Sequence, residues 1–367
     1  MTEQELIYGV ALKSVPNIGD KTAKSLIAYC GSAEAVFQSK KSGLLKIPDI
    51  GEKSAESIIK FKDFDRIAQE IKFAQSKGIN IYFYFDKEYP QRLKDCVDSP
   101  LFLFVKGNTD LNAQRVLAVI GTRNATQYGR EFCYSLGQAL MGTNCLIVSG
   151  LAFGIDTYAH KEALNNQLPT AAILGHGLKT ISPPRNRSLA KEILDEGGAL
   201  ITEHFSDEPP NPENFPKRNR IVAGMCDGLI IVESGNRGGA MITAELAWGY
   251  DREIYAVPGR ITDIYSQGCN KLISTNKAMS VESAEKLVEY LGWNQQSNKN
   301  TRPFALEQNL SEQEKRIYNQ MRSGEKHIDT LFAESGIGLS ELSMILLDLE
   351  FKGIVISLPG KVYKIRS

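Results

Sequence analysis

The chain has 367 residues, 42% of them hydrophobic and 23% charged, and this length and apolar share indicate two or three packed domains rather than a disordered protein. Its formal net charge of zero excludes a uniformly basic nucleic-acid binder, so any nucleic acid has to bind through local clusters of cations. The sequence contains no run of about 18 apolar residues and no signal-peptide core, which excludes a membrane-spanning segment and predicts a cytoplasmic protein.

The N-terminal segment, residues 1–78, contains an internal repeat. Residues 15–19 (VPNIG) precede a helical run at Lys21–Cys30, and residues 47–51 (IPDIG) precede a helical run at Lys53–Phe61. The pattern resembles the tandem helix-hairpin-helix of SAM-like domains, in which the glycine lets N–H groups at a helix start approach a DNA phosphate. Because cations and carboxylates balance here, helical packing or dimerisation is as compatible with the pattern as DNA contact.

Residues 79–293 alternate short aliphatic runs with helical patterns, such as Tyr128–Met141 and Ile242–Tyr250. This alternation predicts an α/β fold, namely an extended Rossmann-like, doubly wound and mostly parallel sheet with helices on both faces. The expected strands are Val116–Ile120, Leu146–Val148, Ala171–Leu174, Ala199–Thr202, Leu229–Val232 and Ile254–Val257.

A polar stretch follows, and residues 294–309 are expected to form a linker. Residues 310–367 then show the order of a winged helix, with three helical runs before a strand pair. The third run carries Glu341, Asp348 and Glu350, which fit the phosphate backbone of DNA poorly, so a protein-interaction or accessory role is favoured for this domain. The expected elements are helices at Glu312–Arg322, Ile328–Ser335 and Leu339–Lys352 and strands at Ile354–Leu358 and Val362–Ile365.

Glycines and cations follow every predicted strand of the central domain. The carboxyl ends of parallel strands share one edge of a sheet, so these residues are expected to gather there. Glycines permit close backbone approach, helix starts offer N–H donors, and arginine binds phosphate oxygens in pairs, which together predict a site for an anion with several phosphates. The segments are Gly121–Asn124, Ser149–Asp156, Gly175–Gly177 with Arg185–Arg187, Phe215–Arg220, Glu233–Gly239, and Pro258–Arg260 with Gly268–Lys271.

Other ligands and activities are less well supported. Arg123 stands where a dinucleotide site needs its second glycine, so NAD is disfavoured. The six cysteines are scattered without a C-x-x-C pair and the acids form no nucleophile–base pair, so no metal, cofactor or catalytic residue is expected. Two alternatives stay open. One is an enzyme acting on nucleoside monophosphates through Glu245, because residues 238–245 resemble the motif of lysine-decarboxylase-like phosphoribohydrolases, and the other is a scaffold for a small phosphate ligand.

In their order these motifs resemble the DNA-processing protein A (DprA/Smf) family over nearly the whole chain, through stretches such as VIGTRNATQYGR, SGLAFGIDTYAH and FPKRNRIVAGMCDGLIIVE. The resemblance implies a homodimeric, non-enzymatic protein that binds single-stranded DNA without sequence preference. It also implies loading of the RecA recombinase during natural transformation and recombination, including onto strands covered by single-strand binding protein. The DNA-binding residues that it implies are Gly121, Arg123, Ser149, Gly150, Gly154, Asn186, Phe215, Arg218, Asn219, Arg220, Thr243, Asn270 and Lys271, to which Asp156 is added as a matching motif position.

The chain departs from the family pattern at a few positions. Lys179 and Ser182 replace an aspartate and a tyrosine that precede the motif asparagine, and Gly238 stands where serine is usual. Phe153 stands where arginine or leucine is frequent and is either a base-stacking face or a core aromatic. The expected mechanism is a grip on successive phosphates by Arg123, Arg218, Arg220 and Lys271, with a base stacked on Phe215.

Overall fold

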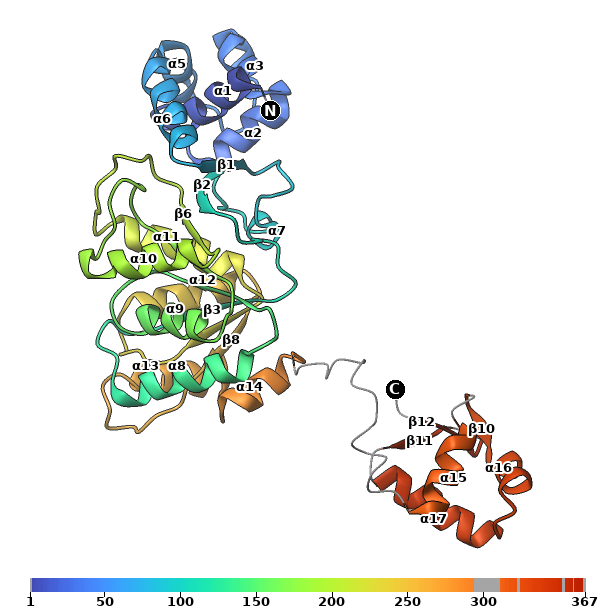
Figure 1. Ribbon diagram of the computed structural model, residues 1–367. Helices are drawn as coiled ribbons and strands as arrows, with labels where there is room; N and C mark the ends of the chain where they lie inside the picture. The colour runs from blue at the N-terminus through green and yellow to red at the C-terminus, as the bar shows by residue number, and fades with distance from the viewer. Residues whose placement is uncertain (1, 294–310, 322–323, 352–353, 359, 366–367) are drawn as a thin grey trace. The chain divides into compact units, whose positions relative to one another are not determined.

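The computed structural model describes residues 2–293, 311–321, 324–351, 354–358 and 360–365. They divide into two compact units, Met1–Asn294 and Gln295–Ser367 (Figure 1). The expected linker, residues 294–309, lies outside the described residues, as do Arg322 and Lys352 at the ends of two expected helices.

The first unit begins with a group of helices in which the predicted tandem repeat is confirmed. Asn17 and Asp49 occupy equivalent turn positions with φ of 66° and 65°, a left-handed region that Asn and Asp tolerate better than most residues. Gly19 and Gly51 are the N-caps of the helices that follow, with φ of −90° and −89°. The helices are α1 (Glu3–Ser14), α2 (Asp20–Cys30), α3 (Ala33–Gln38), α4 (Lys41–Leu44), α5 (Glu52–Lys60) and α6 (Phe64–Ser76).

The central part of this unit is a nine-stranded sheet in the order β1-β2-β6-β5-β4-β3-β7-β8-β9. Strand β2 pairs antiparallel with both β1 and β6, and all other pairs are parallel, so the predicted mostly parallel sheet is confirmed. The strands are β1 (Ile79–Phe83), β2 (Phe102–Gly107), β3 (Val116–Ile120), β4 (Leu146–Ser149), β5 (Thr170–Ile173), β6 (Ala199–Thr202), β7 (Gly228–Ile231), β8 (Glu253–Ala256) and β9 (Met279–Ser280).

Helices cover both faces of the parallel strands. Side chains alternate between the two faces along a strand, so each strand contributes to both cores. In β3, Val116, Ala118 and Ile120 join a core with helices α7 (Gln91–Lys94), α11 (Asn214–Met225), α12 (Gly239–Gly249) and α13 (Gln267–Ser274). Leu117 and Val119 of the same strand pack on the other face, against α8 (Gln127–Leu140), α9 (Ile155–Asn165) and α14 (Ala284–Tyr290). This three-layer arrangement explains why the strands read as uninterrupted aliphatic runs.

The order of the strands reverses next to β3. Strand β4 lies on one side of β3, and β7, which comes much later in the chain, lies on the other. In open α/β sheets the crevice beyond the carboxyl ends of two such strands is the usual place for a ligand, because the connections diverge to opposite faces there. The fold therefore locates a candidate site beyond Ile120 and Ile231.

The N-terminal helices are joined to the sheet by an apolar core and by buried charges. Their hydrophobic cluster includes Phe83, Phe102 and Phe104 of β1 and β2. Beside it, Lys13 Nζ lies 2.7 Å from Asp20 Oδ1 and 2.8 Å from Glu203 Oε2.

Arg220 completes this cluster from the sheet side. Its Nη2 lies 2.7 Å from Glu203 Oε2 and 3.3 Å from Asp20 Oδ2. We call Lys13, Asp20, Glu203 and Arg220 the ion cluster. Its two cations and two carboxylates balance, as buried charges require.

The second unit has the predicted winged-helix elements. They are α15 (Glu312–Met321), β10 (Lys326–His327), α16 (Ile328–Ser335), α17 (Leu339–Phe351), β11 (Val355–Leu358) and β12 (Val362–Ile365), with the strands in the order β10-β12-β11. Within the part of the chain that the structure describes, no single helix is long and apolar enough to cross a membrane. Only Ile328–Ser335 and Leu339–Glu350 reach that length and composition as a pair, and a bend of 115° separates them.

Candidate functional site

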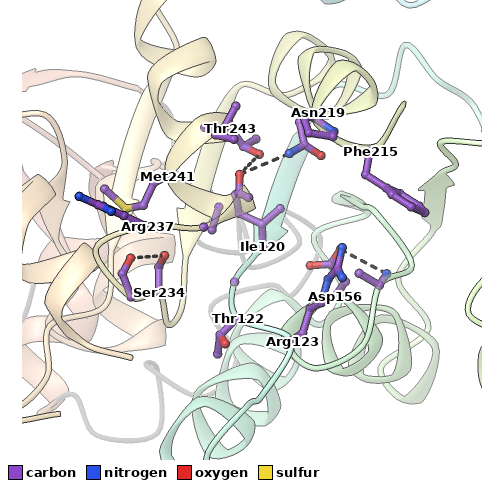
Figure 2. Close-up of a pocket in the computed structure, with 18 of the residues that line it drawn as sticks. Ile120, Thr122, Arg123, Asp156, Phe215, Asn219, Ser234, Arg237, Met241 and Thr243 are labelled. Atoms are coloured by element: carbon purple, nitrogen blue, oxygen red, sulfur yellow. Dashed lines mark hydrogen bonds between the residues drawn. The ribbon is translucent and has the colours of Figure 1, made fainter. Parts of the chain in front are cut away.

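A cavity of about 880 Å³ opens beyond the carboxyl ends of β3 and β7, at the reversal point of the sheet (Figure 2). Its walls come from the loops after these two strands, Gly121–Arg123 and Ser234–Gly238, and from helices α11 and α12. We call it the first cavity. The predicted meeting of several rim segments at one edge of the sheet is therefore present in the structure.

Six of the predicted site residues line the first cavity. They come from three segments that are far apart in the sequence, and Figure 2 shows four of them, Arg123, Phe215, Asn219 and Thr243, around a common opening. Arg123 is exposed, and its guanidinium carbon lies 5.9 Å from the centre of the Phe215 ring. Asn219 Nδ2, one turn beyond Phe215 on α11, and Thr243 Oγ1 on α12 both donate to the carbonyl of Gly239. The six residues are Gly121, Arg123, Phe215, Arg218, Asn219 and Thr243.

Arg218 forms part of the cavity wall but is itself only 5% exposed. Its Nη1 donates to the carbonyl of Ile173, and among the described residues its Nε has no hydrogen-bond partner. Burial lowers the pKa of Arg218 to about 10, and the charge of Asp156 limits that decrease. Gly150 makes room for this guanidinium, because a Cβ there would lie 2.1 Å from Arg218 Nη1. Arg218 thus supplies a fixed positive charge beneath the cavity.

Asp156 is the negative partner of this buried charge. Its Oδ2 accepts hydrogen bonds from the N–H groups of Gly150 at 3.1 Å and Ala152 at 3.4 Å. Burial raises the pKa of Asp156, although Arg218 and these N–H groups oppose the rise. A carboxylate held in this way orders the loop between β4 and α9, which is the role expected for an acid at a helix start.

Gly154 joins this loop to the loop after β3. The backbone of Gly154 has φ of 77°, and a Cβ there would lie 2.2 Å from the carbonyl oxygen of Thr122. The next residue, Ile155, donates its N–H to the same oxygen at 3.1 Å. Only glycine fits here, and the close approach sets the position of Arg123.

Two predicted residues, Ser149 and Asn186, have internal partners and do not line the cavity. Ser149 Oγ donates to the carbonyl of Val119 at 2.6 Å. Asn186 Nδ2 donates to the carbonyl of Leu151 at 2.9 Å. These two side chains are buried and fix strands and loops behind the cavity wall.

Asn270 and Lys271 lie on α13, away from the first cavity. Asn270 exchanges hydrogen bonds with the backbone of Gly259, at 2.9 Å and 3.2 Å, and so holds the loop after β8. Lys271 is exposed but is not among the lining residues. The structure does not bring either side chain to the residues that line the cavity.

The sequence predicts that Arg220 holds a phosphate, whereas in the structure Arg220 has internal ion-pair partners. Its side chain is 14% exposed and donates to Glu203 and Asp20 in the ion cluster. Arg218 and Arg220 both belong to α11, where two positions apart means about 200° around the helix axis. When Arg218 faces the cavity wall, Arg220 therefore faces the N-terminal helices.

Arg237 belongs to the predicted rim segment Glu233–Gly239 but is not among the predicted site residues, and the structure adds it to the site. It is exposed, it lines the first cavity, and it makes no hydrogen bond or ion pair with any described residue. Its position in the loop after β7 could be predicted from the glycine-rich segment that contains it. Tyr265 also lines the cavity, but it lies in a long connection after β8 that gave no signal.

The acidic side chains around the cavity are already engaged. Glu245 lines it but accepts hydrogen bonds from Lys277 Nζ at 2.8 Å and 2.6 Å. Glu233 is buried and accepts from the backbone N–H and hydroxyl of Thr126. Among the described residues no group of three or more His, Cys, Asp or Glu side chains is placed to hold a metal ion.

Comparison with protein families gives matches along most of the chain. The family described as DNA recombination-mediator protein A matches residues 80–292. The DprA winged helix domain matches residues 301–361, and a SAM-like helix-hairpin-helix tandem matches residues 10–61.

Individual relatives agree with these matches. Protein Smf of Escherichia coli is 34% identical over 282 residues, which cover 76% of this chain and 75% of that protein. DNA processing protein DprA of Streptococcus pneumoniae is 38% identical over 205 residues, which cover 56% of this chain and 72% of that protein.

Two solved structures have a similar fold. The X-ray structure of DNA processing protein A from Streptococcus pneumoniae has a TM-score of 0.65 and 30% identity, covering 78% of this chain and 98% of that chain. A structure of DNA processing protein A from Helicobacter pylori, which concerns its single-stranded DNA binding mode, has a TM-score of 0.53 and 27% identity. It covers 59% of this chain and 97% of that chain.

Proposed function

The chain belongs to the DNA recombination-mediator protein A (DprA/Smf) family, and from this premise we propose that it binds single-stranded DNA without sequence preference in the first cavity. The observation that carries the proposal is the exposed Arg123 guanidinium beside the Phe215 ring at the mouth of this cavity. A cation next to an aromatic face suits a phosphate and the base attached to it.

The cavity offers contacts to the backbone of a strand rather than to particular base edges. Arg123 and Arg237 lie on loops after β3 and β7 and can each bind a phosphate. The N-terminus of α12 at Gly239 adds backbone N–H donors and the positive end of a helix dipole. A base stacked on Phe215 contributes about 1–3 kcal/mol whatever its identity. A duplex hides the faces of its bases, so this stacking favours a single strand.

We further propose that the bound strand is passed to the RecA recombinase in natural transformation and recombination, including strands covered by single-strand binding protein. The role is non-enzymatic and cytoplasmic. The carboxylates of Asp156, Glu233 and Glu245 already accept hydrogen bonds within the protein, which supports a non-enzymatic role, because a general base needs a free carboxylate within reach of its substrate. Incubation with a panel of nucleoside monophosphates tests it, since release of free base would instead favour the phosphoribohydrolase activity.

A homodimer is part of the same proposal. Trp248 is 50% exposed on α12 and lies about 120° around the helix axis from Ile242, which lines the first cavity, so Trp248 marks a separate side of this helix. A second copy packed on this side would bury apolar surface and place two cavities on one strand, which raises the overall affinity by avidity. Sedimentation of Trp248→Glu tests this, because the wild type should sediment as a dimer and the variant as a monomer. A monomeric wild type at micromolar concentration would contradict it.

The DNA-binding proposal is tested by fluorescence anisotropy with single-stranded and duplex oligonucleotides across a salt series. Arg123→Ala should weaken binding to oligothymidine and lower the slope of log affinity against log salt by about 0.7, the value of one single-strand phosphate. Arg187→Ala is the matched control, because Arg187 is exposed but does not line the cavity. Equal affinities of the wild type and Arg123→Ala at two salt concentrations would contradict the assignment.

A further inference from the structure

A second cavity of about 560 Å³ lies next to the first, and Arg123 lines both. The second cavity is built from the loop after β3, the start of α8, the loop between β4 and α9, and the turn before α10 (Arg187–Asp195). Its volume is within the range of small-ligand sites. No residue of the family resemblance was assigned to it apart from Arg123 and Gly154.

Three guanidinium groups and no carboxylate line the second cavity. Arg123 and Arg185 are exposed and form no ion pair with any described residue. Arg130 lies with its guanidinium carbon 5.2 Å from the centre of the Tyr158 ring, and its Nη2 donates to the carbonyl of Ala125 at 3.3 Å. The lining therefore selects an anion, and arginine is the side chain best suited to phosphate.

The second cavity also presents an aromatic face that the fold does not use. Phe153 is 42% exposed and makes no ring contact with another aromatic residue among those described. The alternatives for Phe153 were a core aromatic and a stacking face, and its exposure excludes the core. An exposed phenyl ring between arginines has the composition of a stacking platform for single-stranded nucleic acid.

The loops that carry these side chains are held in place from behind. Asn186 Nδ2 donates to the carbonyl of Leu151 at 2.9 Å and to Thr157 Oγ1 at 3.0 Å, which ties the turn bearing Arg185 to the loop bearing Phe153. The close contact of Gly154 with Thr122 ties the same loop to Arg123. Arg185, Phe153 and Arg123 thus belong to one ordered surface, and Asn186 is a positioning residue.

We propose that the second cavity binds a further nucleotide of the same single strand, with its base stacked on Phe153 and its phosphates held by Arg185 and Arg123. The strand would run from the first cavity across Arg123 into the second. This inference rests on the proposed function of the first cavity and extends it by one neighbouring subsite. A mononucleotide or inorganic phosphate would neutralise the arginines of the second cavity, but it would not extend past Arg123 into the first cavity.

The test is a length series of fluorescein-labelled oligothymidine, from the dinucleotide upward, with wild type, Phe153→Ala and Phe153→Trp. The shortest oligonucleotides that bind should occupy the first cavity alone and bind Phe153→Ala like the wild type. Longer ones should bind Phe153→Ala about 5- to 150-fold more weakly, the loss of one stacked base. Phe153→Trp should keep the affinity, and its added fluorescence should be quenched by long but not by short oligonucleotides.

Controls separate this inference from the proposal beneath it. Phe85→Ala removes a phenyl ring that is 51% exposed and lines neither cavity, and it should bind all lengths like the wild type. Arg185→Ala should weaken only the longer oligonucleotides, whereas Arg187→Ala should have no effect. If the wild type binds no oligothymidine, the proposed function fails. If it binds and Phe153→Ala matches it at every length, or if thymidine monophosphate alone quenches Phe153→Trp, the second subsite fails while the first stands.

Discussion

Replacing Arg220 by methionine should lower the stability of the protein without lowering its affinity for DNA. The ion cluster is neutral, and its side chains are between 7% and 22% exposed. Without Arg220, Asp20 and Glu203 share only Lys13, so one carboxylate is left buried without its partner. Breaking a buried pair in this way costs about 3–5 kcal/mol, and because these side chains are partly exposed we expect a loss of about 3 kcal/mol.

Urea unfolding followed by tryptophan fluorescence measures this loss, because Trp248 and Trp293 are the two tryptophans of the chain and both lie in the first unit. With an m value of about 3 kcal/mol per M, the midpoint should fall by about 1 M. The double variant Arg220→Met/Glu203→Gln keeps the Lys13–Asp20 pair and restores neutrality. Its loss should be smaller than the sum of the two single losses by at least about 1 kcal/mol.

The opposite pattern would refute the reasoning. If Arg220→Met kept the wild-type midpoint but lowered the affinity for oligothymidine and the salt slope, then Arg220 would reach the DNA and the ion cluster would be energetically irrelevant. Arg123→Ala provides the comparison, since it should change binding and leave the free energy of unfolding within about 0.5 kcal/mol of the wild-type value.

Two further predictions concern pH and the backbone. Burial acts to raise the pKa of Glu203, but Lys13 and Arg220 outweigh it and hold the pKa at about 2, below the usual 4.5. The stabilisation by the Glu203 carboxylate is therefore complete above pH 4.5 and should be lost as the pH falls towards 2. The urea midpoint of Glu203→Gln should consequently depend less on pH over this window than that of the wild type. If the midpoints of the two proteins fall in parallel as the pH is lowered, the prediction is contradicted. Gly154→Ala should lower both the melting temperature and the affinity for oligothymidine, the latter at least about tenfold, because its Cβ would collide with the Thr122 carbonyl. Gly197→Ala is the control for strain alone, with φ of 78° but no atom within 4 Å of the added Cβ, and equal losses of affinity in both variants would show that the loop contact is unimportant.

The sheet was predictable where burial alone decides the sequence. Val116–Ile120 and Ala199–Thr202 match their strands to the residue, Leu146–Val148 ends one residue before its strand does, and the other three expected strands are displaced by one position. Each is covered on both faces, so a short aliphatic run identifies it. Strands β1 and β2 were not predicted individually. They pair antiparallel at the side of the sheet, and their aromatic residues pack against the N-terminal helices, a tertiary contact that local sequence does not specify.

The site was predictable in its chemistry but not in every direction of its side chains. The run from Phe215 to Arg220 was predicted only as a rim segment, with no helix assigned to it, whereas it lies in the first turns of α11. Pro216 lies within the first turn of this helix, where proline is tolerated. Once the run is helical, Arg218 and Arg220 must point to different partners. Asn186 is a second example. The motif identified it as a site residue, but the sequence did not show that its amide donates to the backbone behind the cavity wall.

Helix α11 has a consequence that extends beyond either of its arginines. Through Arg218 and Phe215 it forms one wall of the first cavity, and through Arg220 it is fastened to the N-terminal helices. A rotation of α11 about its own axis would disturb the cavity wall and the ion cluster at the same time. A protein that drew the helix-hairpin-helix region away from the sheet would release that restraint, which faster amide exchange along 214–225 would reveal. The N-terminal region would then influence how tightly the strand is gripped without touching the nucleic acid itself.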